Sequence, residues 1–204
     1  MEAARFALRL SSHRAFAPLI GVTDPKRLPD PEAALDALPR GTALIWRTYD
    51  RAPTREELHR LTGKAHRKGV TLLLAGARPS ETQAAHFGRH LPERELRRPA
   101  LRGCDASLHR RTSPLALTAA CHSENAIRRA AEARVDAVLI SPAFPTESHP
   151  DETSLGVIRF TQLARTARAL GLKPYALGGI ITPTHIRRLN GTGAEGVAGI
   201  GFLL

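Results

Sequence analysis

Short apolar runs alternate with amphipathic stretches along almost the whole chain. Seven runs consist largely of aliphatic residues without the polar alternation of half-exposed strands; they are 18–23, 43–46, 70–74, 115–120, 137–141, 174–177 and 196–200. A weaker eighth run, 88–91, comes between the third and the fourth. Continuous apolarity of this kind is typical of strands that are buried on both faces, as in parallel sheets. The pattern therefore predicts parallel strands.

Four of the stretches between the runs carry helix signals, at 54–69, 123–134, 157–170 and 183–190. In the first, Thr54 and Glu57 have the spacing of a capping box, and Gly69 is the expected end of the helix. In the third, we expect Ile158, Leu163 and Leu170 on the apolar side. The pattern thus alternates strands with helices.

The repeat length of this alternation identifies the fold class. Eight strands in 204 residues amount to one strand roughly every 25 residues, the length of one βα unit. The predicted fold is therefore a (β/α)8 TIM barrel, a single α/β domain with short helices. A doubly wound open sheet is the alternative, but no G-x-G-x-x-G pattern follows the first run. We expect residues 1–16 to be an N-terminal extension and residues 17–204 to form the barrel.

The chain is strongly basic, with 30 Lys+Arg against 19 Asp+Glu and a net charge of +11. Its arginines occur as pairs in separate stretches, and aromatic residues make up only 4%. Nucleic-acid surfaces usually concentrate their charge and interleave stacking aromatics, so we expect no nucleic-acid partner. A solvated arginine-rich surface and an anionic small-molecule substrate both remain open interpretations.

The expected location is the cytoplasm. No apolar run approaches the roughly 20 residues of a membrane span, so no membrane partner is expected. The first residues lack the continuous apolar region of a signal peptide. Cys104 and Cys121 form no metal-ligand or redox spacing, which is expected of free thiols in a reducing compartment.

Candidate chemistry is found where the strands end, because barrels place their functional residues at the carboxyl ends of the strands. Polar residues gather after most of the runs: Asp24, Arg47, Tyr49, His90, Glu93, Glu95, His122 and Ser123. The last two runs lead into Gly178, Gly179 and Gly199. Glycine lets backbone N–H groups approach a phosphate closely, so these positions are a candidate phosphate site, with a tight structural turn as the alternative.

The segment 141–149 is a second candidate anion site. Two prolines stiffen it, and it carries the anion-binding side chains Ser141, Thr146, Ser148 and His149. A plain structural loop is the alternative. His122 is a candidate acid or base, or a buried hydrogen-bonded histidine, and Cys121 is expected in the core.

Several of these segments together resemble the thiamine phosphate synthase/TenI family, a family of (β/α)8 barrels. The resemblance is most specific in the C-terminal half: residues 135–150 (VDAVLISPAFPTESHP), Leu155-Gly156, 176–180 (ALGGI) and 196–200 (GVAGI). Residues 88–93 (GRHLPE) and 120–123 (ACHS) match in the same order.

The resemblance implies an activity and a set of site residues. The family's synthase joins hydroxymethylpyrimidine pyrophosphate to thiazole phosphate and releases pyrophosphate with the help of Mg²⁺. By position in the family's motifs, Arg47, His122 and Ser123 would be catalytic and Glu95 would bind the metal. The substrate-binding residues would be Thr146, Ser148, His149, Gly178, Gly179 and Gly199.

Some positions depart from the synthase pattern. Residues 76–78 are Gly-Ala-Arg where the synthases have Asn-Asp-Arg, so one magnesium ligand is missing. Tyr49 and His149 replace two lysines. Mg²⁺ would then depend on Glu95 and the phosphates of the substrate, a mode of binding that is common for this ion.

We therefore expect a transferase that makes thiamine phosphate from small phosphorylated substrates, with a homodimer as a possible assembly. Two alternatives stay open. The TenI branch of the family isomerises a thiazole phosphate by proton transfer, using a histidine near the end of strand five, where His122 stands, and needs no magnesium. The other alternative is a barrel that binds a phosphorylated ligand without catalysis.

Overall fold

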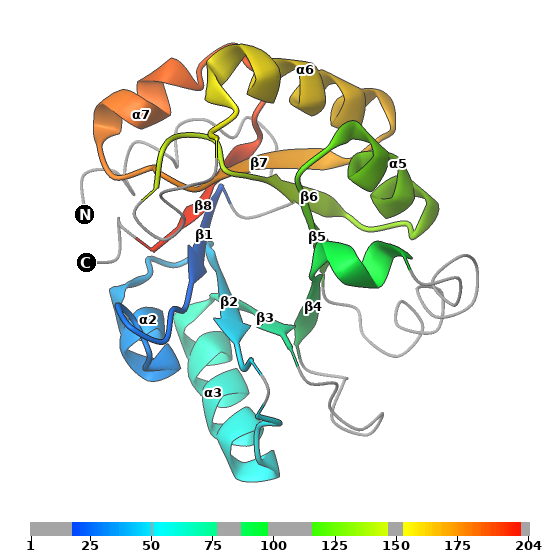
Figure 1. The fold of residues 1–204 in the computed structure, drawn as a ribbon. Helices are drawn as coiled ribbons and strands as arrows, with labels where there is room; N and C mark the ends of the chain where they lie inside the picture. Colours follow the sequence, from blue (N-terminus) through cyan, green and yellow to red (C-terminus); the bar gives the residue numbers. More distant parts are fainter. Residues whose placement is uncertain (1–17, 50, 77–86, 98–115, 147–152, 201–204) are drawn as a thin grey trace.

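The strands close into a parallel barrel in chain order, as the sequence predicts (Figure 1). The structure is a computed structural model that describes residues 18–49, 51–76, 87–97, 116–146 and 153–200. The strands are β1 (Leu19–Val22), β2 (Ala43–Arg47), β3 (Thr71–Ala75), β4 (Gly88–Leu91), β5 (Leu117–Cys121), β6 (Ala137–Ile140), β7 (Lys173–Leu177) and β8 (Gly196–Gly199). Pairing of β1 with β8 completes the barrel.

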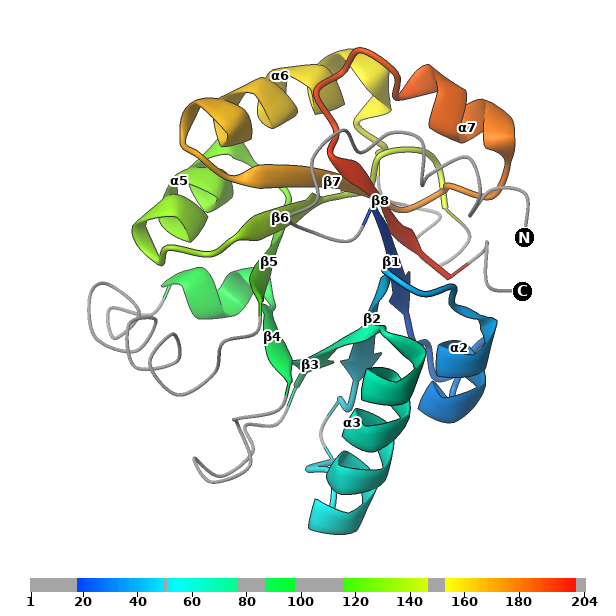
Figure 2. The same ribbon diagram turned by 180° about the vertical axis from the view of Figure 1, so that it is seen from behind.

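The described helices lie outside the ring of strands, as the two opposite views show (Figures 1 and 2). They are α2 (Pro31–Ala37), α3 (Arg55–Lys68), α5 (Glu124–Glu132), α6 (Gly156–Ala169) and α7 (Pro183–Arg188), with a 3₁₀ helix, η2 (Glu93–Arg97). The four predicted helices are confirmed as α3, α5, α6 and α7. Helix α2 was not predicted, although Asp30 caps its N-terminus and Pro31 occupies its first turn.

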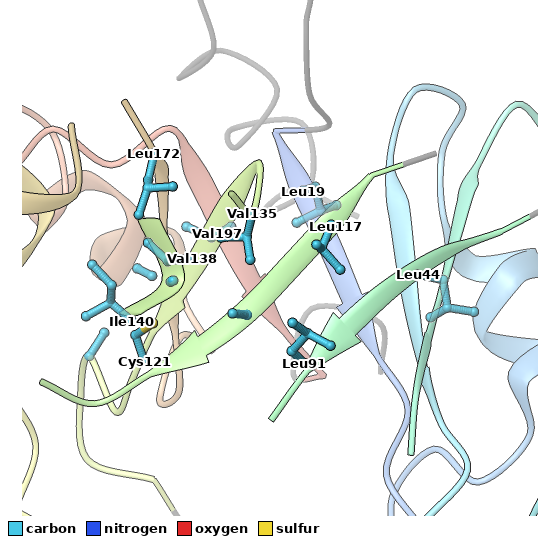
Figure 3. Packing of buried hydrophobic residues seen from close by; sticks show 14 of the residues in the cluster. Leu19, Leu44, Leu91, Leu117, Cys121, Val135, Val138, Ile140, Leu172 and Val197 are labelled. Atoms are coloured by element: carbon cyan, nitrogen blue, oxygen red, sulfur yellow. The ribbon is translucent and has the colours of Figure 1, made fainter. Parts of the chain in front are cut away.

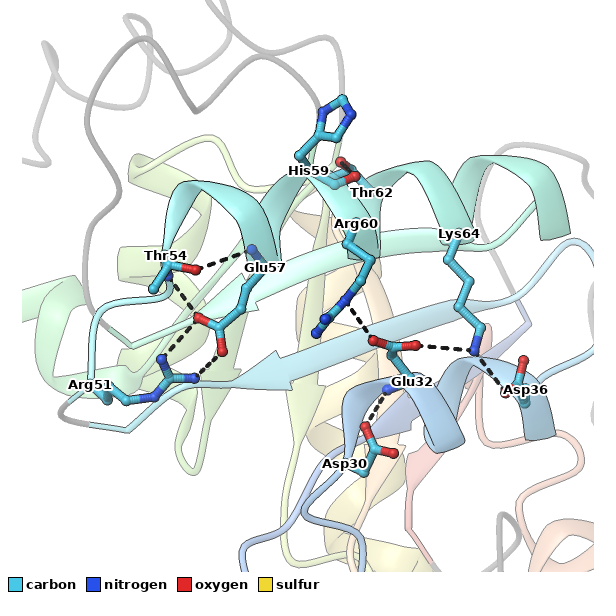
Figure 4. Close-up of polar contacts among 10 residues, drawn as sticks. All are labelled: Asp30, Glu32, Asp36, Arg51, Thr54, Glu57, His59, Arg60, Thr62 and Lys64. Carbon is cyan, nitrogen blue, oxygen red and sulfur yellow. Dashed lines mark hydrogen bonds and ion pairs between the residues drawn. The ribbon is translucent and has the colours of Figure 1, made fainter.

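The predicted capping box of α3 is formed. Thr54 Oγ1 accepts a hydrogen bond from the Glu57 N–H at 3.1 Å, and Glu57 Oε2 accepts one from the Thr54 N–H at 2.8 Å. Arg51 adds a bidentate ion pair to the same carboxylate (Figure 4). Gly69 ends the helix in the left-handed region, with φ +66°. The start and end of α3 therefore follow from local sequence alone.

Apolar side chains of the strands form an inner and an outer hydrophobic cluster, and the buried apolar residues of β4 and β5 all belong to the outer one. The inner cluster fills the barrel with Ile20, Val22, Ala43, Ile45, Leu73, Ala75, Ala137, Leu139, Tyr175 and Ala198. The outer cluster packs the strands against the helices, and Figure 3 shows members such as Leu44, Leu91 and Cys121. Since successive residues of a strand point to opposite faces, the position of a residue along its strand decides whether it can reach the barrel interior.

One expectation about packing was wrong. Ile158 is 79% exposed and does not belong to the buried side of α6, and Leu170, which caps the end of this helix, is 39% exposed. The side of α6 that packs on the barrel is instead formed by Phe160, Leu163 and Ala164. Because Phe160 and Ala164 are four residues apart, they lie on the same face as Leu163, whereas Ile158 is rotated away from it.

Some expectations lie outside the described residues: the N-terminal extension 1–16, Cys104, and Ser148 and His149 of the 141–149 segment. In the part of the chain that the structure describes, no helix is long and apolar enough to cross a membrane. The homodimer and the cytoplasmic location stay predictions.

Candidate active site at the barrel mouth

His122 follows β5 directly and projects into solvent, with its ring held by the end of β6. Its Nδ1 lies 3.0 Å from the backbone oxygen of Ser141 and 3.3 Å from Ser141 Oγ. A carbonyl oxygen can only accept, so we assign the proton to Nδ1, which leaves the lone pair on Nε2. The backbone N–H of His122 donates to Glu93 Oε2 at 2.9 Å. The imidazole is thereby oriented with one nitrogen free for proton exchange.

An open cleft of about 320 Å³ lies against this histidine; its lining consists of His122, Ser141, Pro142, Thr153 and Leu155. The lining residues come from the carboxyl ends of β5 and β6 and from the segment that leads into α6. A cleft of this size accommodates a small molecule. The histidine that the sequence singled out therefore lines a site that is open to a ligand.

The Gly178-Gly179 turn lies beside the start of the 141–149 segment. Both glycines have positive φ values, +95° and +68°. A Cβ on Gly179 would come within 2.6 Å of the Phe144 oxygen, and the Phe144 N–H donates to the Gly178 oxygen at 3.2 Å. Close approach of two loops thus requires glycine here. Among the described residues, the backbone hydrogen bonds outside helices and strands include none donated by the N–H of either glycine.

Phe144 fixes the β6 loop against α7. Its ring is 3% exposed and stacks on the His185 ring, with the centroids 4.8 Å apart. Arg188, which like His185 belongs to α7, places its guanidinium carbon 5.1 Å from the centroid of the Phe144 ring. These contacts hold the loop that carries Pro142 and, further along, the partly exposed Thr146. The described part of the candidate binding loop is therefore a rigid support for the cleft.

Arg47 ends β2 at the same rim of the barrel. It alternates with Ala43 and Ile45, which face the barrel interior, and its guanidinium carbon lies 4.8 Å from the Tyr49 ring centroid. Among the described residues it forms no ion pair. Burial alone would raise the pKa of Asp24, but hydrogen bonds from the backbone N–H groups of Arg27 and Lys26, together with the charges of Arg27 and, last, Arg47, hold that pKa below its ordinary value. Arg47 is thus a cation at the barrel mouth.

His90 is a residue of the mouth to which the sequence alone assigned no role. Its Nδ1 lies 2.8 Å from Thr118 Oγ1 on the neighbouring strand. Burial lowers the pKa of His90 to about 4, with a smaller contribution from the positive charge of Arg47. The sequence analysis named His90 among the polar residues at the strand ends, and the signal that could have assigned it to the interior was its place two residues after Gly88, on the same face of the strand.

Glu95, the expected magnesium ligand, does not face the mouth. The residue is 8% exposed, and its carboxylate lies 3.5 Å from the guanidinium of Arg89, which alternates with the inward-facing His90 on β4. No group of three or more His, Cys, Asp or Glu side chains that could hold a metal occurs among the described residues. The residues present therefore do not fit a magnesium site built on Glu95, because its partner is already a cation.

The two remaining expected residues occupy the ends of strands and helices. The Ser123 hydroxyl caps α5 by accepting the Ala126 N–H at 3.2 Å, which gives it a structural role. Gly199 ends β8 beside Gly21 of β1, on the same rim as the Gly178-Gly179 turn. The structure therefore gathers His122, Arg47 and the glycines at one rim, and places Glu95 and the Ser123 hydroxyl elsewhere.

The sequence profile of the family described as thiamine monophosphate synthase matches residues 19–203, which include all of the strands. The chain belongs to this family. A curated relative named "Putative thiamine-phosphate synthase 2", from Aquifex aeolicus (strain VF5), is 30% identical over 118 residues. The match spans 57% of this chain and 57% of that relative's length.

Solved structures agree on the fold. The thiamine phosphate pyrophosphorylase from Pyrococcus furiosus superposes with a TM-score of 0.64 at 22% identity, covering 89% of this chain and 84% of that one. An HpcH/HpaI aldolase from Desulfitobacterium hafniense DCB-2 gives a TM-score of 0.57 at 14% identity, covering 89% and 85%. At these identities the likeness shows the barrel fold alone.

Proposed function

We propose that this barrel acts on a thiazole phosphate in thiamine biosynthesis and isomerises it by proton transfer, as the TenI branch of the family does. The observation that carries the proposal is the His122–Ser141 contact at 3.0 Å, which orients an accessible imidazole toward a small-molecule cleft. Family membership supports the substrate class. The ion pair of Glu95 with Arg89 favours a reaction that does not need this carboxylate to bind Mg²⁺.

The proposed chemistry uses one histidine twice. Nε2 of His122 removes a proton from one ring position, which breaks a bond to hydrogen and leaves its electron pair on the substrate. Nε2, whose proton exchanges with solvent, then delivers a proton to another position of the ring, so the electron pair is used again and no oxidant or second substrate is consumed. While the imidazole is protonated, the Ser141 carbonyl stabilises the charge through its bond to Nδ1–H. The N–H groups of Gly178 and Gly179 would hold the phosphate.

Condensation to thiamine phosphate is the second candidate, and Arg47 favours it. A cation at the mouth without an ion-pair partner among the described residues suits a leaving pyrophosphate, on which negative charge develops. The relatives' names also point to this reaction. Against it, Tyr49 replaces a lysine of the synthase pattern, and the surroundings of Glu95 do not suit a bound magnesium ion.

Both reactions can be measured on one preparation of the full chain. We expect isomerisation of thiazole phosphate in the presence of EDTA, with loss of activity in His122→Gln and no loss in His59→Gln. The control, His59, is exposed on α3 and remote from the cleft. A second arm supplies hydroxymethylpyrimidine pyrophosphate, thiazole phosphate and Mg²⁺. Thiamine phosphate formed only with Mg²⁺, and no isomerisation in a folded sample, would replace the first proposal by the second.

A further inference from the structure

His90 and Thr118 are two polar residues among largely apolar side chains of the barrel interior. The interior cluster consists of aliphatic side chains and Tyr175. His90 and Thr118 are register partners on β4 and β5, and Thr118 is fully buried. His90 stays partly exposed, and only Leu91 follows it on β4, so its open side faces the mouth. Burying polar groups costs free energy unless they are hydrogen-bonded, and these two side chains meet that condition through each other, with His90 Nδ1 and Thr118 Oγ1 2.8 Å apart.

The hydrogen bonds of this pair select one form of the imidazole. The Thr118 hydroxyl oxygen lies 3.4 Å from the carbonyl oxygen of Arg89. Because a carbonyl oxygen can only accept, the hydroxyl donates its proton to it. A hydroxyl has one proton, so it must accept from His90 Nδ1 at 2.8 Å. Nδ1 then carries the proton, and Nε2 of the neutral ring is a hydrogen-bond acceptor.

The neighbourhood keeps the ring in the neutral form. Ala75 is paired with Arg47 on β2 and, one register step beyond the Leu74–Arg89 pair, lies beside His90 on β4. Only a methyl group therefore separates Arg47 and His90 along this row, and the cation disfavours a second positive charge. The positive charge of Arg47 would also repel a positively charged ligand at this place.

From this geometry we infer that His90 is a specificity-determining residue, whose Nε2 accepts a hydrogen bond from a neutral N–H or O–H group on the ring or side chain of the substrate. The inference rests on the proposed function, because it takes the substrate to be a thiazole phosphate. It adds a requirement that the phosphate cradle and His122 do not impose. Analogues without a neutral donor, or with a fixed positive charge, should bind more weakly even when they keep the phosphate.

The free protein tests the first half of the inference. Nitrogen-15 NMR of the histidine rings distinguishes Nδ1–H from Nε2–H. We expect His90 as the neutral Nδ1–H form at pH 6, where an ordinary histidine is largely protonated, and the opposite tautomer to become populated in Thr118→Val. A wild-type ring that carries its proton on Nε2, or that is charged at pH 6, would overturn the inference without any statement about activity.

Binding tests the second half, with thiazole phosphate and inorganic phosphate as the two probes. His90→Asn keeps an amide near the Nδ1 position for Thr118 and removes the Nε2 acceptor. We expect its affinity for thiazole phosphate to fall roughly 3- to 10-fold, the value of one neutral hydrogen bond, while inorganic phosphate binds as in the wild type. His59→Asn is the matched control.

The outcomes separate the inference from the proposed function. Wild-type protein that binds inorganic phosphate but no thiazole phosphate would overturn the proposed function, and the inference with it. Wild-type protein that binds thiazole phosphate only as tightly as His90→Asn does would overturn the inference alone. An equal loss for both probes would assign His90 a structural role instead and would also overturn it.

Discussion

The two halves of the barrel mouth differ in how far their residues are organised for chemistry. On the β5–β6 side, His122 is held by Ser141 and lines the cleft. On the β2–β4 side, the Arg47 guanidinium packs over the Tyr49 ring, and Glu95 forms an ion pair with Arg89 away from the barrel interior. The difference teaches that a place in a motif does not by itself bring a residue to the mouth: Glu95 lies on η2 and pairs with Arg89, which points away from the inward face of β4.

The largest effect is expected for the organised half. Replacing His122 by Gln removes the nitrogen that exchanges the proton, and the isomerisation rate should fall by about 10²- to 10⁴-fold. Far-ultraviolet circular dichroism should stay unchanged, because the His122 side chain is exposed and fills no core position. A variant that keeps more than a tenth of the rate would show that another group moves the proton.

Glu95 gives the matching test for the other half. Glu95→Gln weakens the pairing with Arg89, so we expect the free energy of unfolding to fall by about 1–3 kcal/mol, with the isomerisation rate unchanged. Urea denaturation and the rate assay provide the two readouts. Unchanged stability combined with a Mg²⁺-dependent loss of activity would restore Glu95 as a metal ligand.

The contact between the Gly178-Gly179 turn and the β6 loop can be tested against a glycine that has no neighbour. Gly179→Ala and Gly41→Ala both place alanine at positive φ, but a Cβ at position 41 meets nothing within 4 Å. We expect a loss of about 1–2 kcal/mol in Gly41→Ala and a clearly larger loss in Gly179→Ala, measured by urea denaturation. Equal losses would mean that the β6 loop yields to the added methyl group.

A region outside the mouth should affect stability alone. The ion pair with Arg51 and the hydrogen bond from the Thr54 N–H lower the pKa of Glu57 to about 2. Because the folded value lies below the ordinary one, this stabilisation is present above pH 4.5 and is lost as the pH falls toward 2.

Two variants of this region separate its contributions. Thr54→Ala should lower stability by about 1 kcal/mol at pH 7. Glu57→Gln should flatten the acid limb of the stability curve between pH 4.5 and 2 relative to the wild type. Denaturation at several pH values checks both, and a change in the isomerisation rate at pH 7 would contradict the separation of regions.

Arg47 is expected to have the smallest effect on isomerisation. If it acts only through its charge across a solvated mouth, Arg47→Ala should raise the KM for thiazole phosphate less than about fivefold. Direct contact with a phosphate would be worth roughly 1.5–3 kcal/mol and would raise KM at least tenfold. The larger value would show that the substrate spans both halves, as a condensation requires.

The barrel could be predicted because local sequence patterns mark its strands and helices. Continuous apolar runs marked the strands, and Thr54 and Gly69 marked the two ends of α3. The short helix α2 was missed because only Ala34 and Leu35 of its residues are buried, which leaves little apolar periodicity. Ile158 shows the same limit. Its apolar side chain suggested a buried position, but its place around α6 leaves it exposed.

The site was predictable only where position along a strand and residue type agreed. His122 directly follows an unmistakable strand, and its place at the rim came from that strand. Glu95 was chosen by its place in a motif. Its ion pair with Arg89 depends on how η2 packs beside β4, and the sequence does not reveal that packing. His90 stayed without a role because its environment comes from Thr118, 28 residues away.

Exchange of hydrogen between solvent and substrate tests the central claim most directly. Thiazole phosphate is incubated in D₂O and EDTA with the wild type, His122→Gln or His59→Gln, and deuterium incorporation is followed by NMR. The account predicts incorporation into the ring with the wild type and His59→Gln and none above background with His122→Gln. Binding of thiazole phosphate by the folded wild type without any incorporation would contradict proton transfer as the function of this barrel.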